Sequence, residues 1–175
     1  MRRTSFADYR CSLSRSLELM GDWWTMLILR DLYLGINRFD DLVEDIGISR
    51  NLLTTRLGDL VAHGLAERRA YQEHPPRFEY VLTEPGAELV PIVLALTAWG
   101  DKWAPPPEGQ PLVFRHDRCG QIFTPRVSCD ACGEPIVADE VTTLPGPGGG
   151  PGPGAYVLAR RLAEKVASGE LSRPG

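Results

Sequence analysis

Residues 39–63 contain two short helical patterns joined by a glycine turn, an arrangement that few folds accommodate. The first pattern, residues 39–46, places its apolar side chains on one side. Gly47 can adopt the left-handed backbone of a tight turn, and Ser49 is a favourable N-cap for a second helix running to about residue 63. This order of elements predicts a helix-turn-helix unit.

The flanking sequence completes the pattern of a winged helix domain. The hairpin carries prolines at its tip, and we expect Pro91 either to bend the last helix or to be tolerated in its first turns. The second helix is apolar on most faces, Trp23 included, and should lie at the centre of the domain. The fold class is therefore mainly α with a small β-hairpin. The remaining predicted elements are helices over residues 13–20 and 23–34, strands over 65–71 and 77–83, and a long helix over 84–103.

The helix that begins after Ser49 has two different faces. Leu53, Leu57 and Leu60 point one way and should pack on the core, whereas small polar residues point the other way and would face a partner. Double-stranded DNA fits that face, with arginines reaching phosphates, although helix-turn-helix geometry is also a common way to pack small helices. The candidate DNA-binding residues are Ser49, Arg50, Asn51, Thr54, Thr55, Arg56, Arg68, Arg69 and Arg77.

An apolar stripe on the long helix exceeds what one small domain needs. A single winged helix offers few base contacts, so useful affinity usually requires two half-sites and a dimer. We expect the stripe and the first helix to form a homodimer interface; the alternative is an ordinary core helix. The candidate interface residues are Leu13, Leu17, Leu89, Ile92, Val93, Leu96, Trp99 and Trp103.

Net charge does not by itself predict nucleic-acid binding, because the 175 residues carry a formal charge of −4. Residues 46–78, however, hold five arginines against three carboxylates. No apolar run is long enough for a membrane helix, and the N-terminus lacks a secretory signal, so we expect a cytoplasmic protein without a membrane partner. No nucleophile motif, phosphate-binding loop or paired catalytic carboxylates occur, which argues against an enzyme.

Composition divides the chain into four parts. Residues 1–104 form the predicted winged helix and dimerisation domain, which ends at a proline run. Residues 108–144 form a Cys-rich appendage, and residues 145–154 are a linker made only of proline and glycine. Residues 155–175 hold a short amphipathic C-terminal helix and tail.

The Cys-rich appendage carries two copies of a ligand-x-x-Cys-Gly pattern. His116 and Cys119 form the first pair, and Cys129 and Cys132 form the second. One histidine and three cysteines can bind a structural zinc ion, and short strands around them, at residues 112–114 and 136–141, would resemble a zinc ribbon. The alternatives are a ribbon that has lost its metal and a redox-active Cys129/Cys132 pair.

Three stretches resemble the HxlR-type winged helix regulators, relatives of the MarR-like family. They are CSLSRSLELMGDWWTMLILRDLYLGINRFDDL, ISRNLLTTRLGDLVAHGLAERRAY and PPRFEYVLTEPGAEL, within residues 9–103. The wing stretch has Phe78 where the family usually has valine. The resemblance implies a homodimeric, usually bacterial, DNA-binding regulator of transcription.

A cysteine also occurs in this family where Cys11 stands, normally followed by proline; here Ser12 follows. The resemblance implies a redox-sensing candidate at Cys11, and the start of a helix would lower the pKa of its thiol. The alternative is a small residue packed at the dimer interface.

These observations predict a repressor that binds an inverted-repeat operator as a homodimer. A small-molecule effector could bind between the long helix and the DNA-binding helices, near Trp99 and Trp103. The alternative from another class is a metal- or redox-sensing protein-interaction module, in which the Cys-rich appendage and tail bind a partner.

Overall fold

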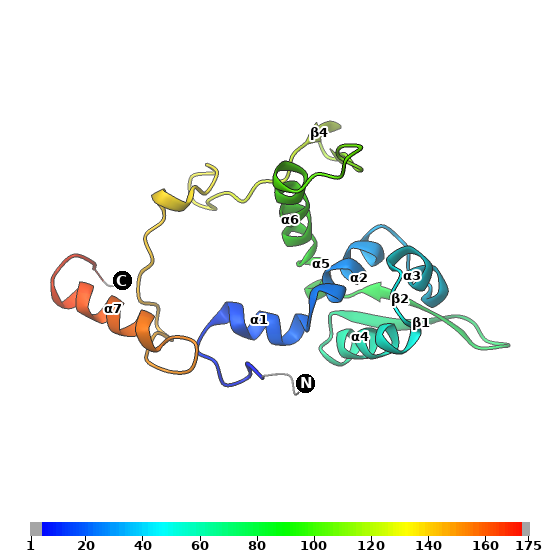
Figure 1. Ribbon diagram of the computed structural model, residues 1–175, viewed down its shortest axis with the longest axis horizontal. Helices are drawn as coiled ribbons and strands as arrows, with labels where there is room; N and C mark the ends of the chain where they lie inside the picture. The colour runs from blue at the N-terminus through cyan, green and yellow to red at the C-terminus, as the bar shows by residue number, and fades with distance from the viewer. Residues whose placement is uncertain (1–4, 173–175) are drawn as a thin grey trace. The chain divides into compact units, whose positions relative to one another are not determined.

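The computed structural model describes residues 5–172 (Figure 1). The chain forms two compact units, one spanning Trp23–Ile136 and the other combining the segment that ends at Asp22 with the segment that begins at Val137. This division differs from the predicted domains. The first helix groups with the C-terminal tail, and most of the Cys-rich appendage groups with the winged helix.

The larger unit contains the predicted winged helix, and the predicted fold class is confirmed. Two strands pair antiparallel as the wing, with Ala66 opposite Leu82 at its base. Helices surround this hairpin as the sequence pattern indicated. The elements are α2 (Trp23–Tyr33), α3 (Phe39–Ile46), α4 (Arg50–Ala62), β1 (Ala66–Gln72), β2 (Arg77–Leu82), α5 (Glu84–Ala87) and α6 (Val90–Trp103).

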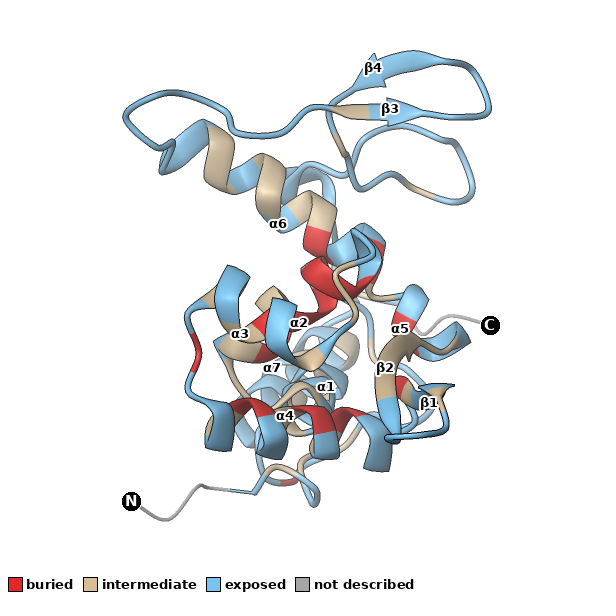
Figure 2. Ribbon diagram, turned by 90° about the vertical axis from the view of Figure 1, so that its right-hand side faces the viewer, coloured by how far each residue is buried: buried red, intermediate tan, exposed pale blue. Residues whose placement is uncertain are grey.

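The core of this unit is built from leucine and isoleucine side chains of α2, α3 and α4. Ile28 and Leu29 of α2 and Leu42 of α3 are fully buried. In α4, buried and exposed positions alternate with the helical period, as the red and pale blue segments of Figure 2 show. Trp23, predicted to be buried, is 77% exposed because it occupies the first turn of α2, outside this core.

The predicted long helix over residues 84–103 is wrong as a single element. Thr83 caps α5, its side-chain oxygen accepting from the Gly86 N–H, and α6 begins at Val90 after a break. Pro91 lies in the first turn of α6, where its missing N–H costs no helical hydrogen bond. Of the two expected outcomes for Pro91, the structure therefore shows tolerance in the first turn of a helix and not a bend.

A buried carboxylate, which the sequence pattern did not indicate, lies on α2 beside the arginine that connects this helix with α3. Asp31 is fully buried, and its Oδ1 accepts a hydrogen bond of 2.6 Å from Arg30. Burial raises the pKa of the Asp31 carboxyl, and the Arg30 guanidinium partly opposes this shift. Arg30 also pairs with Asp45 of α3 at 2.8 Å, so one guanidinium joins the two helices.

The loop between α2 and α3 extends the wing sheet. The Tyr80 N–H of β2 donates to the Asn37 carbonyl at 2.8 Å, and Arg38 forms an isolated antiparallel bridge with Glu79. The Asn37 amide also donates to the Glu79 carboxylate at 3.3 Å. These contacts fix the position of the wing relative to the start of α3.

The Cys-rich appendage contains a second hairpin, formed by β3 (Phe114–His116) and β4 (Gln121–Phe123). The strand predicted at residues 112–114 lies instead at β3. Residues 136–141 form no strand; they contain the short 3₁₀ helix η1 (Ala138–Glu140). Three-residue strands without a buried side chain leave little to hold a longer sheet together.

The smaller unit contains α1 (Ser12–Met20) and α7 (Tyr156–Ala167). As predicted, Gly21 ends α1 with a positive φ of 84°. The Arg10 N–H donates to the Pro153 carbonyl at 2.9 Å, which attaches the segment before α1 to the end of the linker. Within residues 5–172, no helix combines the length and apolar character needed to cross a membrane.

Candidate DNA-binding surface

The outward face of α4 is small, polar and exposed, as predicted. Asn51, Thr54, Thr55 and Gly58 are all exposed. Leu53, Leu57 and Leu60 are buried on the other side. The Thr54 hydroxyl donates to the Arg50 carbonyl and the Thr55 hydroxyl to the Asn51 carbonyl, at 2.9 and 3.1 Å. Both hydroxyl oxygens keep lone pairs that can accept hydrogen bonds from a base edge.

Ser49 starts α4 as predicted. Its hydroxyl oxygen accepts from the Leu52 N–H at 3.4 Å, and its backbone is extended, as an N-cap requires. The positive end of this 13-residue helix therefore opens next to the polar face. A phosphate oxygen is the ligand that such a helix start favours.

The two arginines of α4 differ in how far they reach into solvent. Arg50 is exposed, stacks over the Phe39 ring and pairs with Asp40 at 2.7 Å. The Arg56 side chain is only 17% exposed and pairs with Asp59 at 3.0 Å. Arg50 is thus better placed than Arg56 to exchange its carboxylate partner for a phosphate.

The wing carries the other predicted arginines, all exposed. The Arg68 guanidinium lies 3.5 Å from the centre of the Phe78 ring, and Arg69 pairs with Glu67. Arg77 begins β2 beside the wing tip. All three can meet a phosphate backbone, although Arg69 would have to leave its carboxylate partner.

Arg38 is a candidate that the sequence analysis missed. Its guanidinium lies 4.8 Å from the centre of the Tyr71 ring of β1. Arg38 and Arg77 also line one cleft of about 450 Å³ between the start of α3 and the wing. The sequence does show an arginine immediately before the predicted helix over residues 39–46. It does not show that the loop carrying this arginine pairs with β2, which is what brings Arg38 to the wing.

The candidate dimer residues separate into two groups. Leu13 and Leu17 of α1 are exposed. On α6 the exposed side chains recur every three or four residues and form an apolar stripe, defined here as the α6 stripe. Val93 is buried and Leu89 half-buried against the core, so these two stabilise the subunit itself. The α6 stripe consists of Ile92, Leu96, Trp99 and Trp103, which are 52–64% exposed.

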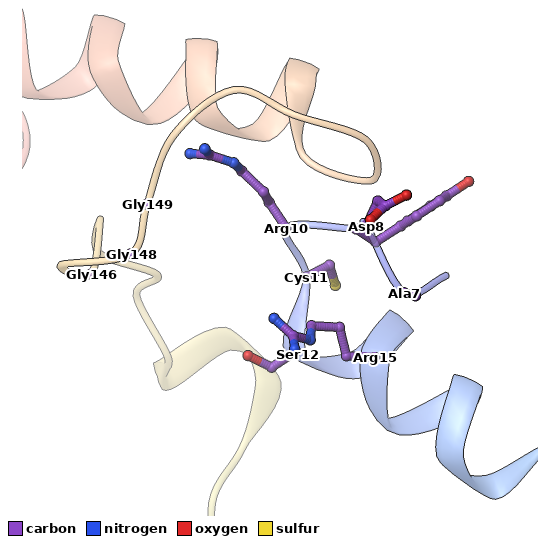
Figure 3. Close-up of a pocket in the computed structure, with 10 residues that line it drawn as sticks. Ala7, Asp8, Arg10, Cys11, Ser12, Arg15, Gly146, Gly148 and Gly149 are labelled. Atoms are coloured by element: carbon purple, nitrogen blue, oxygen red, sulfur yellow. The ribbon is translucent and has the colours of Figure 1, made fainter. Parts of the chain in front are cut away.

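Cys11 is the N-cap of α1 and lines a cavity of about 640 Å³ in the smaller unit. Figure 3 shows it at the cavity wall, with Arg10 and Arg15 also lining the cavity. Hydrogen bonds from the Ser14 backbone N–H and hydroxyl lower the pKa of the Cys11 thiol. The direction of this shift agrees with the prediction from the helix start.

The four candidate zinc ligands lie in two pairs. The His116 Nδ1 and the Cys119 Sγ are 3.4 Å apart. Backbone N–H groups of Cys132 and Ala131, followed by the Cys132 side chain, lower the pKa of the Cys129 thiol. In the described part of the chain, no three His, Cys, Asp or Glu residues lie close enough to hold a metal ion. The zinc site thus stays a prediction.

The predicted effector position near Trp99 and Trp103 is an exposed surface. A cleft of about 510 Å³ lies elsewhere on α6, between the end of α2 and β3. Tyr33, Leu94 and Phe114 are among its apolar lining residues.

Comparison with known proteins places the winged helix in a family. The HxlR-like helix-turn-helix family matches residues 19–108. An uncharacterized HTH-type transcriptional regulator of Mycobacterium tuberculosis is 47% identical over 137 residues, which cover 78% of this chain and 87% of that protein. A corresponding regulator of Synechocystis is 37% identical over 53% of this chain and 70% of its own length.

Solved structures show the same fold. The crystal structure of PA1607 covers 80% of this chain and 98% of its own chain, with a TM-score of 0.69 and 30% identity. The redox regulator HypR in its oxidized form covers 53% of this chain and 96% of its own, with a TM-score of 0.50 and 33% identity. The first similarity covers a larger share of this chain than the predicted winged helix domain alone provides.

Proposed function

This chain belongs to the HxlR-like helix-turn-helix family of DNA-binding transcriptional regulators, and we propose that it acts as a homodimeric repressor on an inverted-repeat operator. The observation that carries the proposal is the exposed, uncharged face of α4. This face can approach base edges because it carries no carboxylate that would repel the DNA phosphates. The first carboxylate of α4 is Asp59, which follows the face and pairs with Arg56. Repression follows if the operator overlaps a promoter, since the bound dimer then excludes the polymerase.

The contacts of each subunit fall into two kinds. Asn51, Thr54 and Thr55 would meet base edges in the major groove, where an asparagine side chain pairs best with adenine. Arg50 and the wing arginines would meet phosphates and set the register without reading sequence. Arg38 joins the phosphate-contacting group because it shares a cleft with Arg77.

The α6 stripe supports the homodimer part of the proposal. Four large apolar side chains on one helix face are costly to leave in water, and a two-fold axis lets the same stripe cover its own copy. Two subunits then present two copies of α4 to adjacent turns of a duplex. Relatives of this kind are usually bacterial, and bacterial DNA lies in the cytoplasm, so we expect the protein to act there.

The first experiment identifies the operator. Genomic DNA fragments retained by the purified full-length chain are sequenced, and the most enriched fragment is footprinted. We expect protection of an inverted repeat whose half-sites are about 10 base pairs apart, and reduced transcription when it overlaps a promoter. If no fragment is enriched, the rival interpretation as a protein-interaction module gains support.

The double variant Asn51→Ala/Thr55→Ala tests the contact assignment. It should weaken binding to that fragment by about tenfold or more, because it removes hydrogen-bonding groups from both half-sites. Both side chains are exposed, so the fold and the dimer should be unchanged. Glu88→Ala, at an exposed position away from α4, is the matched control. Equal mobility-shift titrations for the double variant and the control would contradict the assignment.

Sensing of an oxidant at Cys11 is a second proposal, favoured by the lowered pKa of this thiol. Peroxide would oxidise the thiolate to sulfenic acid and weaken operator binding by about tenfold. Cys11→Ser should keep its operator affinity in peroxide, measured by mobility shift. Cys129→Ser, which removes a cysteine of the Cys-rich appendage, should remain sensitive. The proposal fails if Cys11→Ser releases DNA as the unmodified chain does.

A small-molecule effector would bind at a different place from the exposed surface near Trp99 and Trp103. We propose the cleft between the end of α2, α6 and β3, because it combines apolar side chains that can cover a ligand with the charged side chains of Arg115, Asp117 and Arg118. A ligand there would contact α6, the helix that carries the proposed dimer surface.

A further inference from the structure

Two turns in the Cys-rich appendage have the same construction. In the first, the Gly120 N–H donates to the His116 carbonyl at 2.7 Å; in the second, the Gly133 N–H donates to the Cys129 carbonyl at 2.8 Å. Both glycines have positive φ, 73° and 78°, which other residues rarely adopt. Each turn therefore brings the first and last residues of a ligand-x-x-Cys sequence to the same side of the backbone.

Each turn also closes a hairpin. The first connects β3 to β4, with His116 opposite Gln121. The second is closed by the Cys129 N–H donating to the Glu134 carbonyl at 2.8 Å and by a bridge between Ser128 and Pro135. Two hairpins with ligand pairs at their turns are the two halves from which a zinc ribbon is built.

The segment that carries these turns has no hydrophobic core of its own. Every residue from 112 to 136 is described, and none of them is buried. Val113, Ile122 and Val127 are each more than 60% exposed. A segment of this size that buries so little apolar surface needs a cross-link or a metal to hold one structure. All its cysteines are free thiols, so no disulfide supplies that cross-link here.

We propose that His116, Cys119, Cys129 and Cys132 together bind one zinc ion that joins the two hairpins. Binding requires the two pairs to approach each other, because in the described structure they are not gathered within reach of one ion. The ion displaces one proton from each of the three thiols, while neutral His116 binds through a ring nitrogen. The complex carries a charge of −1. With four protein ligands, the ion has no open position for a reactive water and is structural.

Elemental analysis of the full-length chain, purified without chelator, should find about one zinc ion per chain. Replacing zinc with cobalt should give the intense visible bands of tetrahedral cobalt with thiolate ligands. Cys132→Ser should lose most of the metal and those bands, whereas Cys11→Ser should keep both. Zinc should also slow proteolysis within residues 108–144.

Operator binding distinguishes a variant that has lost only zinc from one that has unfolded. The four candidate zinc ligands lie outside the winged helix core, so a variant that lacks only zinc should still bind the operator. If Cys132→Ser does not fold, removal of zinc from the unmodified chain by a chelator gives the same readouts. The proposal is overturned if the chain holds no zinc and binds none on titration. It is equally overturned if Cys119→Ser and Cys132→Ser both retain the metal, or if Cys129 and Cys132 form a disulfide in metal-free protein isolated under reducing conditions.

Discussion

Replacing Gly86 with alanine is expected to destabilise the winged helix domain by about 3 kcal/mol or more, a large part of the stability of an ordinary domain. Gly86 is buried in α5, and a Cβ atom added there would lie 1.9 Å from the Leu65 carbonyl oxygen. That oxygen belongs to the backbone, so no side-chain rotation relieves the clash. Either α5 or the connection from α4 to β1 must move.

Such a movement would break specific hydrogen bonds. The Leu65 carbonyl accepts from the Thr83 N–H at 3.2 Å, and the Thr83 hydroxyl donates to the Gly64 carbonyl at 2.5 Å. Urea unfolding followed by circular dichroism measures the loss. Gly100→Ala is the matched control: it lies inside α6 with open space around it, and should gain about 1 kcal/mol of stability. Equal midpoints for Gly86→Ala and the unmodified chain would contradict the close approach.

Trp99→Glu is expected to separate the proposed dimer and to weaken operator binding by about 100-fold or more. A carboxylate at the centre of the α6 stripe would face its own copy across the two-fold axis, so each dimer would bury two like charges. A monomer reads one half-site and loses the gain in affinity from the second. Trp99 is 59% exposed in the single chain, so the fold of the subunit should not change.

Sedimentation equilibrium measures the dimer, and a mobility shift with the footprinted fragment measures binding. Tyr156→Glu is the matched control, because Tyr156 is a similarly exposed aromatic residue, 61%, on α7. A dimeric Trp99→Glu variant would place the interface elsewhere. A monomeric variant with unchanged affinity would show instead that one subunit is sufficient for DNA binding.

The helix-turn-helix could be predicted from sequence because its signals are local. Gly47 and Ser49 are only two residues apart, and the leucines of α4 repeat with the helical period. Backbone dihedrals and side-chain direction follow from such short-range patterns. For the same reason, the exposed face of α4 was predicted correctly at residue level.

What could not be predicted depends on contacts between distant residues. Arg38 reaches the wing only because Asn37 pairs with Tyr80, more than 40 positions along the chain. Periodicity assigned Val93 to the surface stripe, whereas the packing of α6 on α2 places it in the buried core. Asp31 is buried where α2 packs on α3, and Arg30, which pairs with it, also reaches Asp45 of α3.

The hydrogen bond between Arg10 and Pro153 fastens the segment before α1 to a segment more than 140 positions further along the chain. Tyr9 packs against Gly154, so residues beside Cys11 gain part of their surroundings from the far end of the chain. A shortened protein that stops before Pro145 would strip that cover from the cysteine as well as deleting α7. A change in peroxide response after such a deletion would therefore not by itself show a separate task of the tail, because the deletion also alters the neighbourhood of Cys11.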